Sequence, residues 1–131
     1  MIKGLSHAAF AVSDMGTALR FYVDQLGLTH AFELHDDQDR PWIHYLKVTE
    51  GQFIELFYGG NPTPPEASFQ HLCLETDNLA ALVERLRAAG VTIDIEPTQG
   101  CDKNLQAWIH DPDGNRIELM QFHPDCPQLN C

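Results

Sequence analysis

The chain carries one sequence pattern twice, and this internal repeat constrains its fold more than any other feature. Equivalent residues recur at a spacing of 63, and the pairs are Asp14 and Asp77, Leu19 and Leu82, Gly27 and Gly90, and Glu55 and Glu118. Two histidines, His7 and His71, recur at nearly the same spacing of 64. Because such a repeat is one supersecondary unit used twice, it outweighs local propensity in predicting the fold.

Each copy has the pattern of a strand, a helix and three further strands. In the first copy Asp14 is a good helix N-cap, apolar residues then recur at three- and four-residue steps, and Gly27 stops the helix. In the second copy Asp77 and Gly90 take these places, and a strand is expected near 91–95. We therefore expect an α+β fold with two tandem βαβββ modules forming a cupped mixed sheet.

The module boundaries follow from the glycine- and proline-rich stretch in the middle of the chain, which suits neither a helix nor a central strand. We expect a single domain over residues 1–131, with module one at about 4–59, a linker at about 60–68, module two at about 69–122 and a tail at 123–131.

The formal net charge of −11 opposes binding to nucleic acid and to anionic membrane surfaces. The sequence has no apolar run long enough for a transmembrane helix and no secretory signal pattern, so we expect a cytoplasmic protein. Its four cysteines form no C-x-x-C pair and are expected to be free thiols.

Each repeat places a glutamate inside an apolar strand. Glu55 shares its strand face with Phe53 and Phe57, and Glu118 shares its face with Arg116 and Met120. A buried carboxylate is costly unless it is paired or coordinates a metal. Both glutamates therefore need a partner.

The repeat supplies candidate partners, because equivalent strands that line one cup bring His7, Glu55, His71 and Glu118 together. Imidazole and carboxylate ligands suit borderline divalent ions such as Zn²⁺, Ni²⁺, Co²⁺, Mn²⁺ and Fe²⁺. A glutamate beside such an ion can also move a proton. The sequence thus predicts a metal site in the cup, with Glu55 and Glu118 as its catalytic residues.

Several motifs resemble the vicinal oxygen chelate superfamily, which unites glyoxalases, bleomycin resistance proteins and dioxygenases, and most closely its glyoxalase I-type members. The motifs are Ser6-His7, Phe53-Ile54-Glu55-Leu56, Gln70-His71-Leu72 and the run from Asp111-Pro112-Asp113-Gly114 to Ile117-Glu118-Leu119. The resemblance implies one divalent ion per site, with nickel, cobalt, zinc or manganese ahead of iron. It also implies that His7, Glu55, His71 and Glu118 are the ligands, and that two subunits of a homodimer share the site.

The activity implied is that of a lyase or isomerase of the lactoylglutathione lyase type, which moves a proton between adjacent carbons through a metal-bound enediolate. Relatives commonly have Arg and Asn where this chain has Ala11 and Gly59, and that Arg helps to hold glutathione. Arg116, Lys103 or Arg40 would have to replace this positive anchor. We therefore expect a substrate that is either a hemithioacetal or a smaller α-hydroxycarbonyl compound.

Other side chains are candidates for lining the substrate site: Trp42, His44, Phe53, Phe57, Arg116 and Met120. Trp42 and His44 share one face of the third strand, and that face either lines the cup or lies outside it.

Two other functions are compatible with the sequence. The first is an Fe(II) extradiol-type dioxygenase with His7, His71 and Glu118 as a facial triad, which oxygen consumption with catechols would reveal. The second is a metal-free small-molecule binding or resistance protein, which keeps binding its ligand after complete metal removal. The complete set of two histidines and two glutamates favours the lyase or isomerase.

Overall fold

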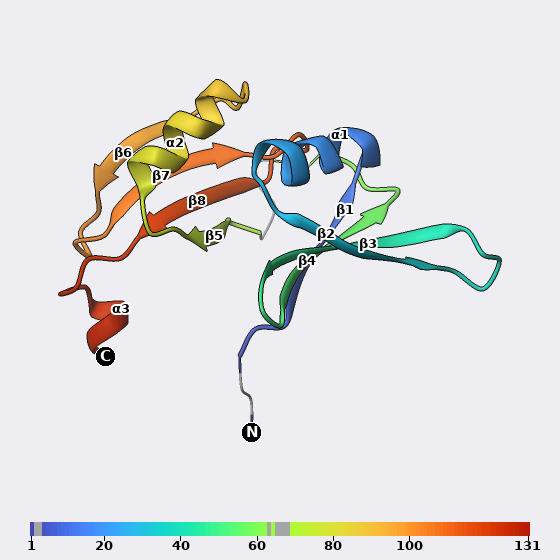
Figure 1. The fold of residues 1–131 in the computed structure, drawn as a ribbon, viewed down its shortest axis with the longest axis horizontal. Coiled ribbons are helices and arrows are strands. Elements are labelled where there is room, and N and C mark those ends of the chain that lie inside the picture. Colours follow the sequence, from blue (N-terminus) through green and yellow to red (C-terminus); the bar gives the residue numbers. More distant parts are fainter. Residues whose placement is uncertain (2–3, 63, 65–68) are drawn as a thin grey trace. The chain divides into compact units, whose positions relative to one another are not determined.

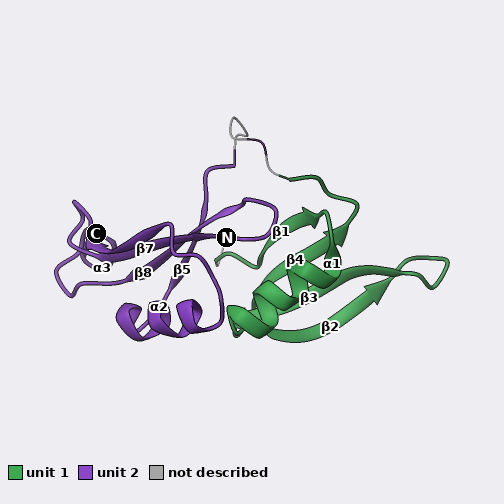
Figure 2. Cartoon of the chain, turned by 90° about the horizontal axis from the view of Figure 1, so that it is seen from above, with its two compact units in different colours: residues 1–62 green, residues 63–131 purple. Residues whose placement is uncertain are grey.

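The computed structural model describes residues 1, 4–62, 64 and 69–131. The chain divides into two compact units, Met1–Pro62 and Thr63–Cys131, coloured separately in Figure 2. Part of the expected linker, residues 63 and 65–68, lies outside the described residues.

Unit 1 contains one four-stranded mixed sheet and one helical segment (Figure 1). Its elements are β1 (His7–Val12), α1 (Met15–Leu19), the π-helical turn η1 (Arg20–Gln25), β2 (Thr29–His35), β3 (Pro41–Thr49) and β4 (Gln52–Tyr58). The strand order is β1-β4-β3-β2, with β1 parallel to β4 and the other pairs antiparallel.

Unit 2 repeats this arrangement. Its elements are β5 (Leu72–Glu75), α2 (Leu79–Ala88), β6 (Ile95–Gln99), β7 (Leu105–His110) and β8 (Arg116–Gln121), followed by the short α3 (Pro127–Asn130). The order β5-β8-β7-β6 matches that of unit 1, and β5 is likewise parallel to β8. The expected α+β fold of two tandem βαβββ modules is confirmed.

Local sequence signals explain the helix boundaries. The Asp14 carboxylate accepts a hydrogen bond from the Thr17 N–H at 2.7 Å, as an N-cap should. Gly27 ends the helical segment with a φ of 91°, in the left-handed region that glycine adopts without strain.

Two boundary predictions for unit 2 were wrong. The N-cap of α2 is Asn78 rather than Asp77, because the Asn78 amide oxygen accepts the Ala81 N–H at 3.0 Å. The next strand begins at Ile95, whereas Val91 is buried at the helix end with its N–H on the Leu86 carbonyl. The apolar residues near 91 therefore close the helix instead of extending a sheet.

Each sheet buries one face beneath its helix. In unit 1 Leu46, Ile54 and Leu56 are almost fully buried, and in unit 2 Ile117 and Leu119 are. Side chains alternate along a strand, so Glu55 and Glu118 lie on the opposite face of their sheets.

Candidate metal centre

The first predicted pair comes together in unit 1. Strand β1 runs parallel to β4 with Ala9 opposite Glu55. His7 lies two residues before Ala9, so its side chain is on the same face of the sheet as Glu55. The His7 Nδ1 atom lies 3.3 Å from Glu55 Oε1. The Glu55 side chain is 6% exposed and that of His7 is 46% exposed, so a buried carboxylate meets an accessible imidazole.

The Glu55 carboxylate has one incompletely satisfied atom. Oε1 is buried and has no hydrogen-bond partner within the described part of the chain. Its neighbour across the sheet is Tyr45, and hydrogen bonding to the Glu55 carboxylate raises the pKa of the Tyr45 hydroxyl. A buried carboxylate oxygen without a hydrogen-bond partner, beside an accessible imidazole, is an arrangement compatible with metal binding.

The second pair comes together in unit 2. His71 Nε2 lies 3.3 Å from Glu118 Oε2, with the two side chains 36% and 9% exposed. Cys73 lies directly opposite Glu118 in the parallel pair of β5 and β8. Cys73 is an exposed residue, but desolvation of its thiol and the neighbouring Glu118 carboxylate raise the pKa of that thiol to about 12.

An aromatic and a cation extend the second pair. Trp108 is the cross-strand neighbour of Glu118, and its ring lies 4.9 Å from the His71 ring in an edge-to-face arrangement. The Arg116 guanidinium lies over Trp108, 4.4 Å from the ring centroid. The predicted substrate residue Arg116 therefore presents its charge beside the His71–Glu118 pair.

Most of the other predicted substrate residues lie on strands that also carry the pairs. Phe53 and Phe57 flank Glu55 on β4, and Trp42, 48% exposed, packs edge-to-face on Phe57 at 6.0 Å. Met120 follows Glu118 on the same face of β8. Its sulfur accepts a hydrogen bond from the Asn104 side chain at 3.6 Å.

His44 occupies a different position from these residues. It lies opposite Leu56 and is 6% exposed, so it is on the helix side of the sheet, away from Glu55. It bonds His30 at 2.8 Å and the Tyr58 hydroxyl at 3.0 Å, and lies 3.1 Å from Glu33. Alternation along β3 defined which residues share a face with His44, but only the register between strands shows which face that is.

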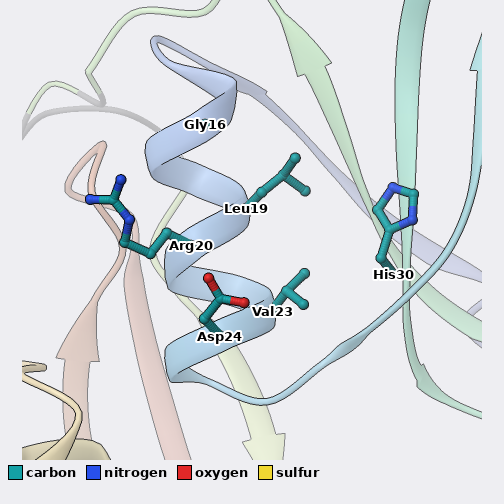
Figure 3. Close-up of a pocket in the computed structure, with 6 residues that line it drawn as sticks. All are labelled: Gly16, Leu19, Arg20, Val23, Asp24 and His30. Carbon is teal, nitrogen blue, oxygen red and sulfur yellow. The ribbon is translucent and has the colours of Figure 1, made fainter.

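The same side of unit 1 has an open pocket of about 410 Å³ (Figure 3). It is lined by Gly16, Leu19, Arg20, Val23, Asp24 and His30. Figure 3 shows His30 on its strand across from the apolar side chains Leu19 and Val23 of the helical segment. Since Glu55 points to the other face of the sheet, this pocket is separate from the His7–Glu55 pair.

The structure also shows where Ala11 and Gly59 lie, the two positions at which this chain departs from glyoxalase I-type sequences. Ala11 lies opposite Phe57, on the face of β1 that carries His7. Gly59 follows β4 with a φ of 82°. Neither position supplies a charge to this face.

The metal ligands were predicted as one group of four, and the described residues show them as two pairs. Among those residues, no three His, Cys, Asp or Glu side chains cluster closely enough to hold a metal ion. Sequence reasoning found both pairs through the repeat, but it missed Tyr45 and Cys73 as neighbours of the glutamates, because cross-strand register carries no local sequence signal.

In the described residues no helix is long and apolar enough to cross a membrane.

Comparison with known proteins bears on these pairs. The family model of the Glyoxalase/Bleomycin resistance protein/Dioxygenase superfamily matches residues 4–119. The chain belongs to this superfamily. The suspected family resemblance is thereby confirmed.

Within the superfamily the chain is similar to proteins with different printed roles. It is 30% identical to a lactoylglutathione lyase of Salmonella typhimurium over 128 residues, which cover 89% of this chain and 91% of the relative. It is 29% identical to TnmS3, an antibiotic binding protein from a Streptomyces species, with a TM-score of 0.73 and coverage of 93% and 98%. The crystal structure of SMU.1112c, 24% identical, shows the same fold with a TM-score of 0.79 and coverage of 92% and 99%.

Proposed function

We propose that the protein is a divalent-metal-dependent lyase or isomerase that moves a proton between adjacent carbons of an α-hydroxycarbonyl or hemithioacetal substrate. The observation that carries the proposal is the buried glutamate beside an accessible histidine, which occurs in both modules at the same distance of 3.3 Å. The similarity to a lactoylglutathione lyase supports the reaction type.

By their donor types, the four predicted ligands suit a divalent ion. His7, Glu55, His71 and Glu118 provide two imidazoles and two carboxylates, and Glu55 Oε1 is buried without a hydrogen-bond partner among the described residues. Such donors suit zinc, nickel, cobalt or manganese. When bound, the ion polarises a substrate carbonyl and makes the neighbouring C–H bond more acidic. As the family resemblance implies, the proposal includes a homodimer.

The proton transfer itself falls to the glutamates. In the proposed reaction, Glu55 or Glu118 removes a proton from one carbon and returns it to the adjacent carbon, so the net change is an isomerisation with no external oxidant. The aromatic side chains Phe53 and Phe57 flank Glu55 and limit the access of water to its carboxylate.

Arg116 is the proposed anchor for an anionic group of the substrate. Its guanidinium is fixed over Trp108, whose ring also contacts His71. A carboxylate bound by Arg116 would therefore lie next to the second pair. This anchor takes the role of the positive charge that Ala11 does not supply.

Replacement of each glutamate tests the proposal. Glu55→Gln and Glu118→Gln keep the size of the side chain but remove its charge and its basicity. Each should lower turnover at least about a hundredfold, as expected when a general base or a metal ligand is lost. The assay uses the hemithioacetal of methylglyoxal and glutathione, and small α-hydroxyaldehydes, after loading with nickel, cobalt, zinc or manganese. Near-wild-type rates in both variants would refute the proposal.

The second candidate is a metal-free protein that binds a small molecule. The similarity to TnmS3 favours it, as do the exposed aromatic side chains of unit 1, among them Phe32 and Trp42. This candidate predicts ligand binding that is unchanged after a strong chelator has removed all metal. The proposed enzyme predicts loss of activity under the same treatment and recovery on adding the ion back.

A further inference from the structure

Tyr45 is a candidate positioning residue that the sequence pattern did not reveal. It lies on β3 directly across from Glu55 on β4, on the same face of the sheet. Cross-strand neighbours in an antiparallel pair have Cβ atoms about 4.5–5.5 Å apart, so the phenol can reach the carboxylate. Hydrogen bonding to the neighbouring Glu55 carboxylate raises the pKa of the Tyr45 hydroxyl, which agrees with this placement.

Two phenylalanines hold the Tyr45 ring in place. Phe32 stacks on it with ring centroids 4.3 Å apart and an interplanar angle of 19°. Phe53 meets it edge-to-face at 5.9 Å. Aromatic contacts of this kind restrict the ring, so the hydroxyl has few alternative positions.

The Glu55 carboxylate then has two different environments. Tyr45 lies beside the carboxylate. The Oε1 atom of Glu55 is 3.3 Å from His7 Nδ1 and has no hydrogen-bond partner within the residues that the structure describes. A carboxylate held by a fixed donor keeps its orientation, and its remaining oxygen points in a constant direction. Partners of this type commonly raise metal affinity because the ligand is already oriented.

The two modules differ at this position. The neighbour of Glu118 that corresponds to Tyr45 is Trp108, which contacts His71 and Arg116. Glu118 instead receives the Cys73 thiol from β5, where unit 1 has Ala9. A phenol is a stronger hydrogen-bond donor than a thiol, so the two glutamates have neighbouring donors of different strength.

We infer that Tyr45 orients Glu55 as a metal ligand by fixing its carboxylate and leaving Oε1 for the ion. This inference rests on the proposed function, because it assumes that Glu55 binds a divalent metal. Tyr45 does not touch the ion or the substrate in this account. It acts only through Glu55.

The test compares two matched Tyr→Phe variants in the full chain. Tyr45→Phe removes the hydroxyl and keeps the ring between Phe32 and Phe53. Tyr58→Phe is the control, because that hydroxyl bonds His44 on the other face of the same sheet. The affinity of chelator-stripped protein for Ni²⁺ and Zn²⁺ is measured by competition with a chromophoric chelator, and thermal unfolding of the metal-free proteins is measured alongside.

We expect Tyr45→Phe to weaken metal binding at least about tenfold without lowering the unfolding temperature, while Tyr58→Phe binds metal like the wild type. Equal affinity of Tyr45→Phe and the wild type would overturn the inference and leave the proposed function intact. If Tyr45→Phe binds metal more weakly and also unfolds at a lower temperature, the hydroxyl has a structural role, and this result would also overturn the inference. Failure of the wild type to bind either ion would refute the proposed function, and the inference with it.

Discussion

The two glutamates occupy equivalent places in the repeat but have different neighbours. Glu55 lies opposite Ala9 and Tyr45, and Glu118 lies opposite Cys73 and Trp108. At the scale of single residues, the proposed chemistry therefore depends on side chains from the adjacent strands as much as on the ligands themselves. The repeat identified the glutamates, but only the register identified these neighbours.

The charge state of His44 couples pH to the folding of unit 1. Burial lowers its pKa, and the effect of burial outweighs that of Glu33, which raises it. The native state therefore prefers neutral His44, whereas the unfolded chain takes up a proton as the pH falls through about 6.5. Stability should decline below that pH. Asp39 and Glu33 raise the pKa of His35, which would make stability increase as the pH falls. His35 is exposed, however, so solvent weakens its interactions with these carboxylates.

Thermal unfolding at pH 8 and pH 5.5 checks this expectation. The wild type should lose about 3–5 °C more on acidification than His44→Gln, which cannot be protonated and can still hydrogen bond with Tyr58. An identical pH dependence of the two proteins would mean that His44 does not control it.

At the scale of elements, the tight turn between β7 and β8 sets the start of the strand that carries Glu118. Asp111 is 1% exposed, and its carboxylate accepts the N–H groups of Asp113 and Asn115 and the Asn115 side-chain amide at 2.8–3.0 Å. Gly114 adopts a φ of 83°. An Asp-Pro-Asp-Gly run has the residues that such a turn requires.

Asp111→Ala should therefore destabilise the protein by about 3 kcal/mol, since it leaves several buried donors without their charged acceptor. Urea unfolding measures the change. Asp37→Ala, in the exposed turn between β2 and β3, is the matched control and should have almost no effect. Equal stability of the two variants would show that the carboxylate network contributes nothing to the turn.

The boundaries of other elements show why the sequence predicts the elements but not their exact caps or the register between strands. Asp14 was predicted as a cap and is one, but in the second copy Asn78 caps the helix although Asp77 is the residue that repeats Asp14. Both side chains can accept a backbone N–H, so one residue of slippage changes little energy. The position of His44 was open for a related reason, because alternation within β3 does not fix its register against β4.

At the scale of the whole molecule, the repeat made the α+β fold of two βαβββ modules predictable, and the structure and the family comparison agree with it. The sequence also named the two histidines and two glutamates, and the structure pairs them within each module. The joining of the two pairs around one ion is our proposal. It requires that each module supply half of the ligands.

The most direct test of this central claim is the metal content of the wild type, His7→Ala and His71→Ala, each purified without chelator and then offered nickel, cobalt, zinc or manganese. Elemental analysis should find about one divalent ion per chain in the wild type and a marked loss in both variants, because each removes one of four ligands from the same ion. Both substituted imidazoles are partly exposed, so the fold should survive, and thermal unfolding of the metal-free proteins verifies this. A wild type without metal, or a loss confined to one variant, would contradict the shared site.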